Sequence, residues 1–347
     1  MLGREAALFP IKKALMYIPL RPIDSSAKGC LGDNFYTAPN PPFGAVFTYY
    51  LKETVKPGAA ARRDEEKKLV EGGKPIPFPG WDKLRREEEE AKPEVILTVT
   101  DEAGQVVRRL NGPLAQGFHR VAWDLRYPAV NPTRLEEPMR ESWDYAPQGP
   151  LVVPGKFTVS LAKRTGGVMT PLGEPQAFVV ESLGLATLAE KDRAALLAFQ
   201  KRAGELQRAM MGAGAAAEDA LRNIAFMKKA LKDTPKADPK LGEAVAALEA
   251  KIREALRRLA GDSTIQQRNE AAPPSLVERL SAQLDATAPI TLTAKADYEI
   301  AAAGFEKLLE EMRVLIEGDL RKLGDALEAA GAPWTPGRNL PKWKKGT

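Results

Sequence analysis

Aspartates that directly follow a tryptophan are the residues of this sequence whose types and placement could do chemistry. Asp82, Asp124 and Asp144 are of this kind. A carboxylate beside an aromatic platform suits glycoside hydrolysis when two acids stand about 5–10 Å apart and share the roles of acid and nucleophile or base. Spacing along the chain does not fix that separation. Trp123 also fits a simpler interpretation, a core anchor of a sheet with Asp124 at the strand end.

An aromatic segment, Trp143-Asp144-Tyr145, lies between predicted strands. Exposed aromatics in such a loop can stack on a sugar ring or dock a partner, and the alternative is that they cap an edge of the sheet. We therefore take Trp143, Tyr145, Asp144 and Asp124 as candidate ligand-binding residues, with carbohydrate as the ligand class.

Other reactive side chains are few. His119 is the sole histidine and lies in a predicted strand, which favours a structural role, and Cys30 is the sole cysteine. A single residue of each kind excludes a Cys-based zinc site, an internal disulfide framework and a His-rich metal site. The Gly212-Ala213-Gly214 segment does not follow a strand, so it is no phosphate loop. The sequence predicts no catalytic residue, metal or cofactor.

The charge of the chain is concentrated at its end. The formal net charge is +5, and residues 331–347 hold Arg338, Lys342, Lys344 and Lys345 without a single acid. A basic tail beside nearly neutral folded regions argues against a nucleic-acid-binding surface. The sequence contains neither an apolar run long enough to span a membrane nor a signal-peptide pattern at its start.

Apolar and polar residues alternate in short segments through much of the first half of the sequence. Residues 44–183 predict an antiparallel β-sandwich, because short alternating segments are separated by Gly and Pro turns. The predicted strands are 44–51, 94–100, 106–110, 118–124, 156–162 and 176–180. Residues 1–43 predict an extended arm or linker. Residues 59–92 contain nine basic and nine acidic side chains and predict a charged, solvent-exposed helical insertion.

A period of about 3.6 takes over after Gly184. Residues 184–330 predict an antiparallel α-helical bundle whose helices each bury one apolar stripe, followed by the basic tail. We expect breaks at Gly212 and Gly214 and at the prolines near 235–239, 273–274 and 289. Asp238 and Thr293 are expected N-caps, the latter opening a helix that runs to about Ala330.

Four segments carry a family resemblance. They are Phe35–Leu51, Gly117–Tyr127, Val153–Val159 and Ala332–Arg338. In this order they resemble the C-terminal region of large bacterial BNR-repeat or sortilin-type β-propeller glycosyl hydrolases. The resemblance implies an Ig-like sandwich followed by a helical domain, and an exported parent located in the periplasm or outside the cell. The Asp-box repeats of the propeller are absent here, so the hydrolase label has no residues in this chain to rest on.

Taken together, the sequence predicts an α+β multidomain chain that acts as a non-catalytic accessory or interaction module. Its partner would be a β-propeller domain, with this chain as the C-terminal part or a separate partner of such a protein, or another protein. The alternative is a carbohydrate-binding or glycoside-hydrolase-associated protein that uses the loop aromatics and carboxylates. A third hypothesis is self-assembly through the apolar helical stripes.

Overall fold

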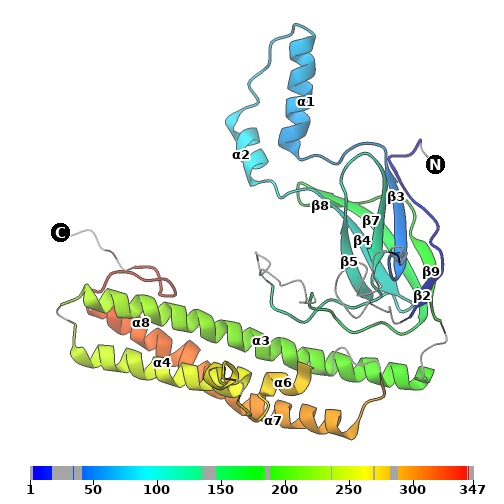
Figure 1. The fold of residues 1–347 in the computed structure, drawn as a ribbon. Coiled ribbons are helices and arrows are strands. Elements are labelled where there is room, and N and C mark those ends of the chain that lie inside the picture. Colours follow the sequence, from blue (N-terminus) through cyan, green and yellow to red (C-terminus); the bar gives the residue numbers. More distant parts are fainter. Residues whose placement is uncertain are drawn as a thin grey trace. The chain divides into compact units, whose positions relative to one another are not determined.

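The computed structural model describes residues 3–17, 34, 41–133, 135, 146–183, 188–235, 237–268, 270–281, 288–341 and 343. It shows a mixed α+β protein whose strands precede its long helices. The chain divides into two compact units (Figure 1). The β unit is built mainly from Met1–Pro128 and Leu151–Ala189, and the helical unit mainly from Glu190–Thr347.

Two sheets make up the β unit. The smaller has the order β1 (Ala6–Leu8), β3 (Ala45–Leu51), β6 (Gly117–Trp123). The larger has the order β2 (Ala14–Met16), β9 (Gln176–Ser182), β7 (Gly155–Thr165), β4 (Glu94–Asp101), β5 (Val106–Gly112), and β8 (Val168–Pro171) pairs with β7. The β2 and β9 strands are parallel, and the other pairs of the described sheets are antiparallel. Because β1 and β2 belong to the segment expected to be an extended arm, part of that segment is built into both sheets.

One apolar core is shared by the two sheets. Trp123 and Tyr49 of the smaller sheet are fully buried. The Trp123 ring meets Phe157 and Phe178 of the larger sheet edge-on, with centroids 5.4 and 6.2 Å apart. Burying an aromatic side chain of this size removes on the order of 150–250 Å² from water, so these contacts are a main source of the stability of the unit.

The hydroxyl group of Tyr49 fixes the start of the loop after β5. It donates a hydrogen bond of 2.6 Å to the carbonyl oxygen of Pro113. Burial raises the pKa of Tyr49 to about 12. A Cβ atom on Gly112 would lie 2.4 Å from the same hydroxyl, so a larger residue there would displace the tyrosine.

The helical unit packs its helices around a second core of leucine, isoleucine, methionine and alanine side chains. Its elements are α3 (Glu190–Lys232), α4 (Pro239–Ala260), α5 (Ser263–Gln266), α6 (Leu276–Ser281), α7 (Leu292–Arg313), the π-helical η1 (Val314–Asp319) and α8 (Leu320–Ala329). The last three follow one another without a break and form one continuous helix.

Two expectations about these helices are wrong, whereas the N-cap at Asp238 and the long last helix are confirmed. No break occurs at Gly212 and Gly214, because α3 runs straight through them. On either side of the two glycines Met210 and Ala217 are buried in the core of the unit, and this packing outweighs the poor helix propensity of glycine. The N-cap of α7 is Thr291, not Thr293, whereas Asp238 caps α4 as expected.

A helical hairpin interrupts the β unit between β3 and β4. It consists of α1 (Gly58–Glu71), a loop, and α2 (Trp81–Glu89). Figure 1 shows the two helices beyond the end of the sheets. Neither helix contains a buried residue, so the hairpin has no part in the core of the unit.

Candidate functional site

The α1–α2 hairpin is the feature of the described structure that core packing does not explain. A sequence of this composition could remain an unfolded loop, since no apolar face is buried. Its helices are instead tied together by polar contacts at the base and in the middle. We define the hairpin as residues 57–90 and its tip as residues 70–81, the end opposite the base.

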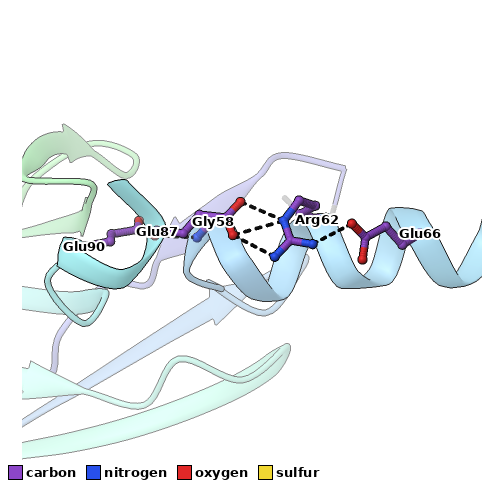
Figure 2. A network of polar contacts seen from close by, with 5 residues as sticks. All are labelled: Gly58, Arg62, Glu66, Glu87 and Glu90. Carbon is purple, nitrogen blue, oxygen red and sulfur yellow. Dashed lines mark hydrogen bonds and ion pairs between the residues drawn. The ribbon is translucent and has the colours of Figure 1, made fainter. Parts of the chain in front are cut away.

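At the base, a carboxylate from the end of the hairpin closes its beginning. The N-cap of α1 is Pro57, whose side chain makes no capping hydrogen bond. The backbone N–H of Gly58 donates instead to Oε2 of Glu90, at 2.7 Å (Figure 2). A negative charge is favourable at a helix N-terminus, so Glu90 both caps α1 and holds the two ends of the hairpin together.

In the middle, one arginine joins the two helices. Arg62 of α1 donates through Nε and Nη2 to the two carboxylate oxygens of Glu87 on α2, at 2.9 and 2.8 Å, and through Nη1 to Glu66 at 2.5 Å (Figure 2). The Arg62 and Glu87 side chains are 15% and 9% exposed. The guanidinium group lowers the pKa of Glu87, and the carboxylates raise the pKa of Arg62. Bidentate geometry with little exposure makes this pair a strong clamp.

The tip carries a cluster of exposed apolar side chains. Val70, Ile76, Phe78 and Trp81 are 58%, 50%, 64% and 67% exposed. The rings of Phe78 and Trp81 meet edge-on with centroids 5.2 Å apart, so the two side chains form one unit. Large apolar side chains that are exposed and in contact with each other mark an interaction site on a folded protein.

The backbone of the tip is fixed by glycine and proline. Gly73 has a φ of +67°, and the N–H of Lys74 donates to the carbonyl oxygen of Leu69 at 2.8 Å, which ends α1 in a defined turn. Pro75, Pro77 and Pro79 then alternate with Ile76 and Phe78. Each proline fixes its own φ and restricts the preceding residue to extended conformations. The tip is therefore a short preformed rod.

A cavity of about 470 Å³ lies at the base of the hairpin, and it is a weaker candidate. Its charged lining residues are largely engaged with one another or with the hairpin. Lys163 pairs with Glu5, Lys56 pairs with Asp64, and Glu90 accepts from Gly58. Groups paired in this way do not converge on a ligand.

A second exposed aromatic group lies on the outer face of the smaller sheet. Phe118 of β6 stands opposite Tyr50 of β3, with ring centroids 5.0 Å apart, and the ring of Phe9 lies 5.8 Å from that of Phe118. Phe118 is 61% exposed. Arg120, two residues along β6, is exposed on the same face.

Of the residues predicted to bind a ligand, the structure describes Asp124. Its Oδ1 accepts a hydrogen bond of 3.1 Å from the N–H of Arg126, and the indole of Trp123 donates to the carbonyl oxygen of Arg126 at 3.0 Å. These bonds hold the turn after β6, in which buried Leu125 has a φ of +59°. Asp124 thus has a structural task. Trp143, Asp144 and Tyr145 lie outside the described residues.

Other contacts account for the sole histidine. His119 packs its ring against Tyr49, 5.1 Å between centroids, and its Nε2 lies 2.6 Å from the carbonyl oxygen of Ala115. Across the ranges that the structure describes, no group of three or more His, Cys, Asp or Glu side chains is arranged to hold a metal ion. Within those same ranges no helix has the length and apolarity needed to cross a membrane.

Sequence reasoning missed the tip as a site, although a signal was present. The segment Lys74-Pro-Ile-Pro-Phe-Pro-Gly-Trp81 places large apolar residues between prolines inside a charged insertion. The balanced charges of the insertion indicated solvent-exposed helices and did not single out this segment. Prolines at alternate positions, which no helix or central strand tolerates, pointed to an exposed rod instead.

Comparisons with known proteins add no functional assignment. No protein-family model matches the chain, and no curated protein matches it either. One solved structure, described as "pT26-6p", is 12% identical over 83% of this chain with a TM-score of 0.13. The match spans 44% of that protein's own length. A likeness this low carries no argument about fold or function.

Proposed function

We propose that this chain is a non-catalytic accessory module that binds another protein through the tip of the α1–α2 hairpin. The observation that carries the proposal is a hairpin clamped by Arg62 and capped by Glu90 that contributes nothing to the core yet exposes Phe78 and Trp81. Aromatic side chains on a preformed support are typical of binding hot spots, because little conformational entropy is lost on association.

The sequence resemblance supports a β-propeller domain as the partner, in the periplasm or outside the cell. On this proposal the two sheets of the β unit are an Ig-like sandwich and the helical unit is an antiparallel bundle. The shared aromatic core of the two sheets and the long helices around one apolar core are compatible with both assignments.

A variant without the hairpin tests this proposal. The N–H of Gly58 and Oε2 of Glu90 are 2.7 Å apart, so a short Gly-Ser linker can replace residues 59–89. We expect the urea unfolding of the variant to match that of the wild type, since no hairpin residue is buried. Titration calorimetry would use a separately produced sortilin-type β-propeller domain. Binding by the wild type and its loss in the variant are expected, and no association at high micromolar concentration would refute the proposal.

A second candidate function is carbohydrate binding, favoured by the Phe9, Tyr50 and Phe118 side chains on the outer sheet face. Adjacent rings on a flat sheet can stack on a sugar ring, and Arg120 could donate hydrogen bonds to its hydroxyl groups. A glycan array with the wild type and Phe118→Ala tests this function. A glycan that binds both proteins equally, or none that binds the wild type, would count against it.

A further inference from the structure

We infer that the partner surface is an apolar pocket rimmed by acidic side chains, into which the tip inserts Phe78 and Trp81 as one wedge. This inference rests on the proposed function and adds the chemistry of the partner. It is drawn from the backbone, the exposed side chains and the charges of the tip.

The exposure of the tip indicates the shape of the surface that accepts it. Every residue from Glu71 to Phe78 is exposed, and the contacting rings of Phe78 and Trp81 stand at the end of the rod. A flat partner surface would leave much of these side chains in water. A concave apolar pocket would bury both rings and Ile76 together.

The prolines determine how a partner can recognise the tip. Proline has no N–H group, so Pro75, Pro77 and Pro79 leave one side of the extended segment without hydrogen-bond donors, and on the other side Ile76 and Phe78 keep theirs. Because so few backbone donors remain, recognition rests mainly on side chains. The extended backbone is already in place before binding, as in other proline-rich segments that dock into aromatic-lined grooves.

The charges near the tip predict the charge at the rim of the partner's pocket. Four exposed lysines, at positions 67, 68, 74 and 83, lie at or near the tip, with Glu71 and Asp82 as the acids among them. The acidic cluster of the hairpin lies toward its base, where Glu87 binds Arg62 and Glu90 binds Gly58. Over residues 67–83 these four lysines outnumber the two acids, so the tip together with its flanking residues is net positive, and acidic groups on the partner complement it.

An anionic membrane surface would also attract lysines and aromatics, but the tip fits it less well. Glu71 and Asp82 are 65% and 89% exposed and would be repelled by anionic lipid. The N–H groups of Ile76 and Phe78 have no hydrogen-bond acceptor in the described structure. A protein pocket can supply acceptors for them while it buries the rings, whereas the hydrocarbon of a bilayer, where the rings would be buried, cannot.

The test compares full-length variants in titrations with the same propeller domain. Phe78→Ala should weaken binding by about tenfold or more, and its control is Val168→Ala, an exposed apolar residue on β8. Lys68→Glu combined with Lys74→Glu should weaken binding about tenfold and reduce its salt dependence. The matched control is Lys229→Glu with Lys251→Glu, two exposed lysines of α3 and α4. Amide exchange should show that all variants keep α1 and α2.

The outcomes separate this inference from the proposed function. Wild-type binding that neither Phe78→Ala nor the Lys68 and Lys74 reversal weakens would overturn the inference and leave the interaction function standing. Loss with Phe78→Ala alone would refute the acidic rim. No binding at all refutes both. Binding of the wild type to phosphatidylcholine vesicles that contain phosphatidylglycerol, abolished by Phe78→Ala, would replace the protein pocket with a membrane surface.

Discussion

The β unit and the hairpin that branches from it are stabilised by different forces. In the β unit, Trp123 and Tyr49 are fully buried, and the aromatic side chains of two sheets interlock. In the hairpin no residue is buried, and the Arg62 to Glu87 ion pair with the Glu90 cap replaces a core. Stability is therefore concentrated in the first region, whereas the second has no core of its own and exposes Phe78 and Trp81.

This difference means that the two regions should respond independently to mutation. A change in the core alters the free energy of unfolding of the unit, because a cavity or an unpaired polar group remains. A change in the hairpin alters only the local opening of its two helices. Distant sites that share no contact partner contribute independently to the free energy of unfolding. Binding surface at the tip can thus vary without loss of the fold.

The largest expected effect is that of Trp123→Ala. It removes a fully buried side chain that contacts Phe157 and Phe178, and should lower the free energy of unfolding by about 3–5 kcal/mol in urea denaturation. Trp81→Ala makes the same chemical change at a side chain that is 67% exposed and should leave unfolding unchanged. Equal effects of the two substitutions would disprove the division of roles.

A smaller effect is expected from Tyr49→Phe. The variant leaves the carbonyl oxygen of Pro113 without its 2.6 Å hydrogen bond and should cost about 1 kcal/mol at neutral pH.

The same tyrosine gives the β unit a pH dependence. Because the folded pKa of Tyr49 is raised from 10.0 to about 12, its contribution is complete below pH 10 and is lost as the pH rises toward 12. Wild type should lose stability over that range relative to Tyr49→Phe, as measured by denaturation at each pH. A constant difference between the two proteins would contradict the assignment. Tyr50→Phe, on the outer face, serves as the control.

Much of the strand pattern could be predicted from the sequence. The alternation of Phe157, Val159 and Leu161 with polar residues marks β7, and the structure buries all three. The β1, β2 and β8 strands were missed because each spans only three or four residues and exists through its pairing with a distant strand. Such pairings are not encoded in local periodicity.

The site was less predictable than the fold. Composition indicated that the insertion is solvated, but the pairing of Arg62 with Glu87, 25 residues later, depends on the two helices folding back on each other. The ring contact of Phe78 with Trp81 likewise depends on the turn at Gly80, which has a φ of +87°. The sequence made Asp124 a candidate ligand-binding residue, whereas in the structure its carboxylate accepts a hydrogen bond that holds the turn after β6.

Local loosening without global unfolding is expected from Arg62→Gln. Loss of the bidentate bond to Glu87 should lower the amide-exchange protection of α2 several-fold, while the urea midpoint of the β unit stays the same. Arg85→Gln removes an exposed pair with Asp82 within one helix and should change neither measurement. A shift of the urea midpoint by Arg62→Gln would show that the hairpin supports the core after all.

The smallest effect is the acid response of the same clamp. Arg62 lowers the pKa of Glu87 below its ordinary 4.5, so the clamp contributes fully at pH values above 4.5 and is lost as the pH falls through the lowered pKa. Exchange protection of α2, corrected for the intrinsic rate at each pH, should therefore decline as the pH falls below 4.5, before the strands of the β unit lose theirs. Arg62→Gln, which lacks the clamp, should show no such decline specific to α2. A decline of equal size in that variant would mean that other carboxylates, and not Glu87, control the acid opening of the hairpin.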